Sequence, residues 1–239
     1  MYNLCSLLFE TKSDYEVNLQ TLLSNIKNAP KDSIIVAPEV CLTGFDYDNF
    51  DAVLTFSTYA NEEIKKLSKD KIIILTIIEK RGDKVFNFAK IFHKGEIIYE
   101  RAKAKLFRFG GEHNYFCEGN EKDIQIVEIN GIKIGVLVCF ELRFKELWKM
   151  LEGCDVIAVP SWWGVLRTEH FKVLTRALAI MNECYVIVSD SANDECTKMS
   201  AIINPQGEVS YNGNNSCLEM IYDKKSIKSM RKYMNIGIK

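Results

Sequence analysis

Cys139 is the residue in this chain of 239 whose type and position most favour chemistry. It follows the apolar run 135–138, which is typical of a buried strand, and it precedes a polar segment that can start a helix. Strand ends in α/β proteins place side chains in a crevice, and backbone N–H groups at a helix start favour a thiolate and an oxyanion. The position therefore predicts a reactive thiol.

Two further polar residues precede the cysteine. Glu39 follows the apolar run 34–37, so it places a carboxylate at a second strand end, and Lys103 lies shortly before the strand that leads to Cys139. Lys105 competes with Lys103, because residues two apart on a strand share a face. Taken singly, a strand-end glutamate is more often a surface helix cap. The ordered set of glutamate, lysine and cysteine favours catalysis instead.

Short motifs surround these residues along nearly the whole chain. They are Pro-Glu with Leu-Thr-Gly-Phe at 38–45, Lys-x-x-Leu-Phe at 103–107, Gly-Glu-His at 111–113, Cys-x-x-x-Arg-Phe-x-Glu at 139–146, Arg-x-x-His at 167–170 and Arg-Ala-x-Ala-x-x-Asn at 176–182. Together they resemble the nitrilase superfamily of carbon-nitrogen hydrolases. The register of the lysine motif in that family identifies Lys103 rather than Lys105.

The resemblance implies a mechanism for amide hydrolysis. Such a reaction needs a strong nucleophile, a charge partner for the oxyanion and a proton for the leaving ammonia. Cys139 would be the nucleophile and Glu39 the base and acid. Lys103 and the backbone N–H of Phe140 would bind the oxyanion, and Glu112 would orient the substrate and Lys103. The alternative for Glu112 is an exposed loop acid.

The segment 106–115 resembles the omega-amidase branch, whose substrates are short amides of dicarboxylates such as 2-oxoglutaramate and 2-oxosuccinamate. A distal carboxylate favours an arginine partner, because a guanidinium binds it through two parallel hydrogen bonds. Arg108, Arg143 and Arg167 are the candidates, and the sequence does not rank them. Trp163 follows a strand end, where it either packs or walls the pocket. Arg143 has a structural alternative, which is pairing with Glu141 or Glu146.

Other activities stay open. A related amidase or N-carbamoyl hydrolase, or a non-catalytic interaction protein with this fold, would share the pattern. A papain-like Cys-His hydrolase would need a histidine base; His113 and His170 are candidates, whereas His93 is expected to face solvent at a turn. The chain departs from the family pattern at Met181, Cys184 and Lys198, which affects the expected substrate range and dimer details.

Composition limits the partners. Acidic and basic residues are mixed, with a formal net charge of −1, so we expect no nucleic-acid partner. We expect no membrane segment and no leader peptide, and therefore a cytoplasmic protein. The eight cysteines lack paired Cys-x-x-Cys spacing, so neither a metal site nor a redox pair is expected, and no cofactor is implied.

Apolar strands alternate with amphipathic stretches, which predicts an α/β protein with a single domain over residues 1–239. We expect helices at 14–28 (with Val17 in the core face), 61–69, 142–151 and 168–182, a long loop at 101–121 and a hairpin at Asn130-Gly131. The resemblance implies more than this pattern. It implies a four-layer αββα sandwich of the nitrilase type, paired with a second copy as a homodimer.

Overall fold

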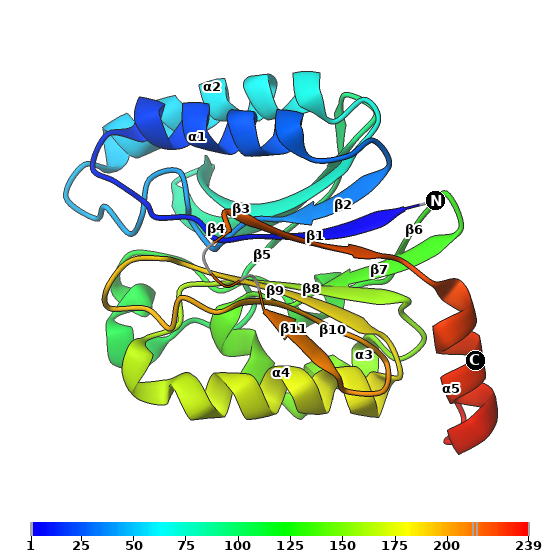
Figure 1. The fold of residues 1–239 in the computed structure, drawn as a ribbon. Helices are drawn as coiled ribbons and strands as arrows, with labels where there is room; N and C mark the ends of the chain where they lie inside the picture. Colours follow the sequence, from blue (N-terminus) through cyan, green and yellow to red (C-terminus); the bar gives the residue numbers. More distant parts are fainter. Residues whose placement is uncertain (1, 212, 214, 239) are drawn as a thin grey trace.

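The fold has four layers, with two β-sheets stacked face to face between two pairs of helices (Figure 1). This is a computed structural model that describes residues 2–211, 213 and 215–238. The remaining residues of the expected 1–239 domain, which are Met1, Asn212, Asn214 and Lys239, lie outside the described residues. The expected αββα sandwich is confirmed.

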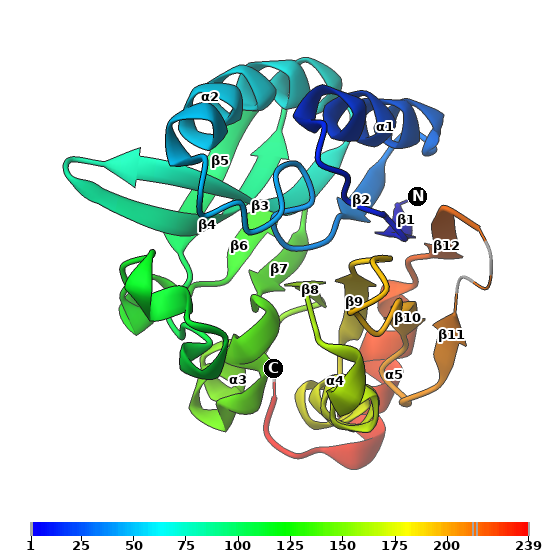
Figure 2. The same cartoon turned by 90° about the vertical axis from the view of Figure 1, so that its left-hand side faces the viewer.

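The first sheet has the strand order β12-β1-β2-β3-β4-β5, in which β1, β2 and β3 are parallel and the outer strands are antiparallel to their neighbours. The hairpin of β3 and β4 reaches outward past α2 (Figure 2). The strands are β1 (Asn3–Leu7), β2 (Ser33–Val36), β3 (Ile72–Arg81), β4 (Lys84–His93), β5 (Glu96–Ala102) and β12 (Cys217–Ile221).

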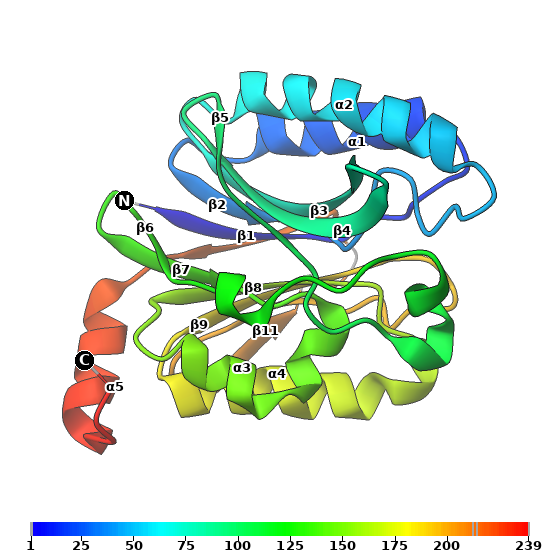
Figure 3. The ribbon, with the colours of Figure 1, turned by 180° about the vertical axis from the view of Figure 1, so that it is seen from behind.

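The second sheet has the order β11-β10-β9-β8-β7-β6, again with three parallel strands in the middle. After β5 the chain crosses from the first sheet to the second (Figure 3). The strands are β6 (Val127–Ile129), β7 (Ile132–Val136), β8 (Val156–Ser161), β9 (Tyr185–Asp190), β10 (Ser200–Ile203) and β11 (Val209–Tyr211). The expected turn joins β6 and β7, with positive φ at Asn130 and Gly131.

Helices α1 (Tyr15–Asn28) and α2 (Phe50–Leu67) cover the first sheet, and α3 (Lys145–Met150) and α4 (Thr168–Asn182) cover the second (Figure 1). Helix α5 (Lys224–Met234) lies beside the sandwich. The Asp14 side chain accepts hydrogen bonds from the N–H groups of Glu16 and Val17, which caps α1 at the expected place.

Some expectations about helices were wrong. Val17 is 44% exposed, and Asn18 takes the core position because its side chain bonds the carbonyls of Lys12 and Leu42. Helix α2 begins eleven residues before 61, where β-branched and aromatic residues hide the helical signal and Asn49 makes no capping bond. The helix expected over 142–151 is divided at Phe144, whose backbone is extended, and residues 101–102 belong to β5 rather than to the loop.

The apolar core between the sheets joins side chains of both, and three serines add hydrogen bonds across it. Ser189 and Ser200 of the second sheet both donate to the Leu7 carbonyl at 2.7 Å, and Ser6 of the first donates to the Val188 carbonyl. These bonds tie the end of β1 to β9 and β10. The two sheets therefore hold a fixed relative position, which a site built from residues of both requires.

Candidate active site

Glu39, Lys103 and Cys139 lie at the ends of strands from both sheets. Glu39 follows β2, Lys103 follows β5, and Cys139 starts the 3₁₀ helix η4 (Cys139–Arg143) after β7. All three are at least nine-tenths buried. Lys103 Nζ donates to Glu39 Oε1 at 2.7 Å. The structure therefore brings together side chains that stand far apart in the sequence.

Lys103 also holds the loop after β5 through Glu112. Its ammonium lies 2.8 Å and 2.9 Å from the two carboxylate oxygens of Glu112, and Oε2 of Glu112 accepts the Phe107 N–H at 3.0 Å. Glu112 is buried, not an exposed loop acid. Lys105 points elsewhere and pairs with Glu121 near the surface. Geometry thus favours the lysine that the family register identifies.

Asn87 contacts the same carboxylate and was missed by sequence reasoning. Its Nδ2 donates to Glu39 Oε1 at 2.8 Å from the middle of β4, where Asn87 is fully buried. A signal was present, because asparagine is depleted in strands and this one stands between two phenylalanines of an apolar strand. Glu39 Oε2 is left as a buried oxygen with no hydrogen-bond partner in the part of the chain that the structure describes. This is the oxygen available to take a proton.

The backbone at Cys139 is held in an unusual conformation. Its φ is +44°, in the left-handed region that costs a non-glycine residue about 1–3 kcal/mol. Val40, which follows Glu39, has φ +43°, and its N–H donates to Thr76 Oγ1 at 2.7 Å. The thiol lies 3.6 Å from the Trp162 carbonyl. Such backbone strain is typical of functional positions, and here it occurs beside both Glu39 and the thiol.

The buried charges shift three pKa values. Burial raises the pKa of Glu39, and the positive charge of Lys103 opposes that rise only in part. Burial, and then the negative charge of Glu39, raise the pKa of the Cys139 thiol well above its ordinary value. Burial would lower the pKa of Lys103, but Glu39 and Glu112 together outweigh it and raise that pKa. A raised pKa favours the protonated thiol rather than the thiolate that the sequence position favours, so attack by the sulfur requires a base.

A buried ion pair stabilises the backbone next to the active-site residues. Arg101 donates to both carboxylate oxygens of Glu141, at 2.7 Å and 2.6 Å, and neither side chain is exposed. Glu141 also accepts the N–H groups of Ala104 and Val138, the residues next to Lys103 and Cys139. One carboxylate thus fixes the backbone beside two site residues. The alternative that Arg143 pairs with Glu141 is therefore wrong, because Glu141 binds Arg101.

A small pocket of about 20 Å³ opens at the thiol. Arg143 lies 4.8 Å over the Trp163 ring, and Arg167 lies 5.1 Å over the Phe107 ring. The pocket is lined by Phe107, Cys139, Phe140, Arg143, Trp162, Trp163, Gly164 and Arg167. Trp162, Trp163 and two of the three candidate arginines therefore border it.

Arg108 lies outside this pocket and pairs with Glu118 on the surface at 3.1 Å. No histidine lines the pocket in the described part of the chain. His93 is buried, contrary to expectation, and its Nδ1 lies 3.0 Å from the Lys71 carbonyl. His113 is exposed, and His170 contacts Arg143 at 3.1 Å. Geometry thus favours glutamate over histidine as the base.

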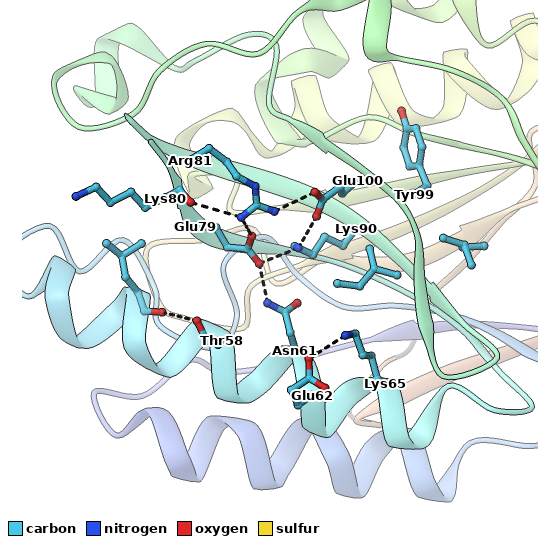
Figure 4. Close-up of a pocket in the computed structure, with 13 residues that line it drawn as sticks. Thr58, Asn61, Glu62, Lys65, Glu79, Lys80, Arg81, Lys90, Tyr99 and Glu100 are labelled. Carbon is cyan, nitrogen blue, oxygen red and sulfur yellow. Dashed lines mark hydrogen bonds and ion pairs between the residues drawn. The ribbon is translucent and has the colours of Figure 1, made fainter. Parts of the chain in front are cut away.

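A larger, open groove of about 720 Å³ lies between α2 and strands β3 to β5 (Figure 4). Its charged side chains form ion pairs with one another. Lys90 contacts Glu79 and Glu100 at 2.7 Å each, and Arg81 contacts the same two carboxylates at 2.6 Å and 2.9 Å. No cysteine lines the groove among the described residues. The small pocket at Cys139 is therefore the better candidate for chemistry.

Comparison with known proteins agrees with this geometry. The model of the carbon-nitrogen hydrolase family matches residues 2–232. This protein belongs to the carbon-nitrogen hydrolase family. Among the described residues, no helix is both long and apolar enough to cross a bilayer.

The relatives include named amidases. The chain is 30% identical to the 2-oxoglutaramate amidase of Bacillus subtilis (strain 168) over 194 residues, which are 77% of this chain and 74% of that protein. It is 26% identical to the omega-amidase YafV of Escherichia coli (strain K12) over 227 residues, 92% of this chain and 88% of that protein. The structure of Saccharomyces cerevisiae Nit3, a member of branch 10 of the nitrilase superfamily, matches with a TM-score of 0.85 at 23% identity and covers 99% of this chain and 95% of Nit3. That likeness concerns the fold.

Proposed function

We propose that this protein hydrolyses the terminal amide of small omega-amido acids, of the 2-oxoglutaramate or 2-oxosuccinamate type, to a carboxylate and ammonia. Two observations carry the proposal: Lys103 bonds both Glu39 and Glu112, and a pocket opens at Cys139. The names of the two amidase relatives support the substrate class. The basic test is ammonia release from a panel of omega-amides, nitriles and N-carbamoyl compounds.

In the first half-reaction, the thiol proton of Cys139 passes to Glu39 as sulfur attacks the amide carbon. The free oxygen of Glu39, Oε2, is the acceptor that the hydrogen-bond pattern leaves available. The carbonyl π electrons move to oxygen, and Lys103 and the Phe140 N–H stabilise that oxyanion. The first N–H groups of a helical segment have no carbonyl of their own segment to bond, which suits Phe140 to this role. When the C–N bond breaks, Glu39 returns the proton to nitrogen and ammonia leaves.

In the second half-reaction, water hydrolyses the thioester. Glu39 removes a proton from water, and hydroxide oxygen attacks the acyl carbon while the same donors hold the new oxyanion. The C–S bond then breaks and the proton returns to sulfur. Because Glu39 alternates between base and acid, a pKa raised by burial suits both steps better than that of an exposed glutamate.

Arg143 and Arg167 would bind the distal carboxylate. Both border the pocket, and burial followed by the charge of Arg167 lowers the pKa of Arg143, as expected for two positive charges near one pocket. A carboxylate between them would relieve this repulsion. Trp163 and Phe107 support the two guanidinium groups through their rings.

Replacing Arg143 or Arg167 with glutamine is expected to raise KM for 2-oxosuccinamate about 10- to 100-fold, the effect of losing one charged hydrogen bond. Neutral butyramide should be little affected, because it lacks the carboxylate. The matched control is Arg108→Gln, outside the pocket. Steady-state ammonia release measures all three variants. An Arg108 variant with the larger KM effect would assign the carboxylate contact to Arg108 instead. Better turnover of a neutral amide, nitrile or N-carbamoyl compound by the wild type would reject this substrate class.

A different function in this fold would be non-catalytic interaction. Such a protein has no need for a buried lysine between two carboxylates beside a strained cysteine, and leaving those charges in the interior is costly. Another amidase or an N-carbamoyl hydrolase would keep this arrangement. The substrate panel separates an enzyme from a non-catalytic protein, since only an enzyme releases ammonia from a compound of the panel.

We propose a homodimer through the outer face of α4. Val173, Ala177, Ile180 and Met181 form a stripe at helical spacing, and Val173 and Met181 are 63% and 58% exposed. Met181, one of the departures from the family pattern, thus lies on this face. The family resemblance implies pairing with a second copy, and apolar surface of this kind is typical of homodimer interfaces. The cytoplasm remains the expected location.

Val173→Glu is expected to convert a dimer into a monomer, because it buries a charge in an apolar contact. Sedimentation velocity at micromolar concentration measures the change, and Lys172→Glu on the same helix is the control. A wild-type protein that sediments as a monomer at that concentration would rule out the dimer.

A further inference from the structure

Two thiols and a carboxylate meet at the edge of the first sheet, and none of the three residues lines the pocket at Cys139. The ligand atoms of Cys5, Cys217 and Glu219 all lie within 4.8 Å of one another. In the pairing of β1 with β12, Cys5 stands opposite Glu219 and Leu7 opposite Cys217. Because alternate residues of a strand share a face, all three side chains lie on one face of the sheet. It is the face covered by α1 and α2.

The surroundings suit a cation that enters from solvent. Cys5 is buried, Cys217 is half-buried and Glu219 is exposed, so the set runs from the core to the surface. Strand β12 is the edge of its sheet and pairs with β1 alone.

We propose that Cys5, Cys217 and Glu219 bind a thiophilic divalent cation such as Zn²⁺. In a tetrahedral zinc site with Zn–S bonds of about 2.3 Å, neighbouring ligand atoms lie about 3.5 to 3.8 Å apart, so only small side-chain movements are needed here. Thiolates select soft or borderline ions over Mg²⁺ and Ca²⁺. Water can fill the fourth position, because the edge is open to solvent.

A bound ion would fasten the C-terminal strand to the N-terminal strand. Strand β12 has five residues, of which Glu219 and Ile221 are exposed, and it has a neighbour on one side only. A cation held by ligands from both strands binds the folded state more tightly than the unfolded chain, so it stabilises that pairing. This role is structural and does not depend on the proposed amidase activity.

The test uses the reduced, full-length protein in a Cys139→Ala background, so that the active-site thiol takes no metal. Cd²⁺ is the probe, detected by the ultraviolet charge-transfer band of its thiolate bonds, and Zn²⁺ is the competitor. One equivalent should bind in the background protein and in the control Cys117→Ser, whose half-buried thiol is outside the cluster. Cys217→Ser should weaken binding by at least about 10- to 100-fold, the loss that even a supporting partner causes.

A second measurement covers the case in which Cys217→Ser fails to fold. Zn²⁺ should slow alkylation of Cys217, but not of Cys117, in the folded background protein, as read residue by residue by mass spectrometry. Glu219→Gln, an exposed and conservative change, should reduce that protection. Equal alkylation of Cys217 with and without Zn²⁺, or equal Cd²⁺ affinity in a folded Cys217→Ser protein, would overturn the proposal.

Discussion

Cys139→Ala is expected to abolish turnover, with a fall in kcat on the order of 10⁴- to 10⁶-fold, because removing a nucleophile also removes the covalent pathway. The fold should persist. Cys139 contributes one small side chain at the pocket wall, and alanine tolerates its backbone conformation about as well as cysteine does. Ammonia release measures activity, and circular dichroism with thermal melting measures folding.

The matched control is Cys184→Ala, which removes an equally small thiol from the core rather than from the pocket. It should keep wild-type kcat, although its melting temperature can fall because of the cavity. If Cys139→Ala and the wild type release ammonia at equal rates from an accepted amide, Cys139 is not the nucleophile. A mass shift on Cys139 after trapping the acyl-enzyme would identify the thioester directly.

Lys103→Met is expected to lower kcat about 100- to 1,000-fold, the usual effect of removing one oxyanion donor. It should also destabilise the fold by about 3–5 kcal/mol, because Glu39 and Glu112 would lose their buried counter-charge. Lys105→Met is the control and should change kcat only a few-fold, since Lys105 pairs with Glu121 near the surface. Steady-state kinetics and chemical denaturation measure the two effects.

A double variant separates the catalytic role of Lys103 from its structural role. In Lys103→Met with Glu112→Gln, one uncompensated charge is gone, so part of the lost stability should return while activity stays low. Recovery of activity together with stability would mean that Lys103 matters only for folding. A larger kinetic loss in Lys105→Met would mean that the other lysine binds the oxyanion.

The three departures from the family pattern have different structural settings. Met181 lies on the exposed face of α4, and Cys184 is fully buried before β9. Lys198 stands near a usual family glycine, and its φ is +55°, a conformation that glycine adopts without strain. Its ammonium pairs with Asp194 at 2.6 Å on the surface. The backbone there thus keeps a glycine-like shape with a side chain added, and none of the three residues lines the pocket at Cys139.

Local signals in the sequence were sufficient for several elements. Helix α4 has the expected bounds at 168–182, and the β6–β7 turn is the Asn130-Gly131 turn that the sequence predicts. Each depends on residues a few positions apart, namely helical periodicity or a dipeptide that tolerates positive φ. The order of glutamate, lysine and cysteine at successive strand ends is likewise readable from the chain. The start of α2 could not be predicted from the sequence, because its first turns lack a helical composition and a capping bond.

Other features were decided by tertiary structure alone. Periodicity left Lys103 and Lys105 equivalent, and only the tertiary structure buries the first between two carboxylates and leaves the second near solvent. Three other features likewise depend on residues that are far apart in the chain. They are the ranking of the arginines, the contact of Asn87 with Glu39 and the Arg101–Glu141 pair. The return of β12 to β1, which brings Cys5 beside Cys217, belongs to the same class. Sequence patterns report on neighbours within a few residues, whereas these contacts arise from strand order and sheet stacking, which no local pattern encodes.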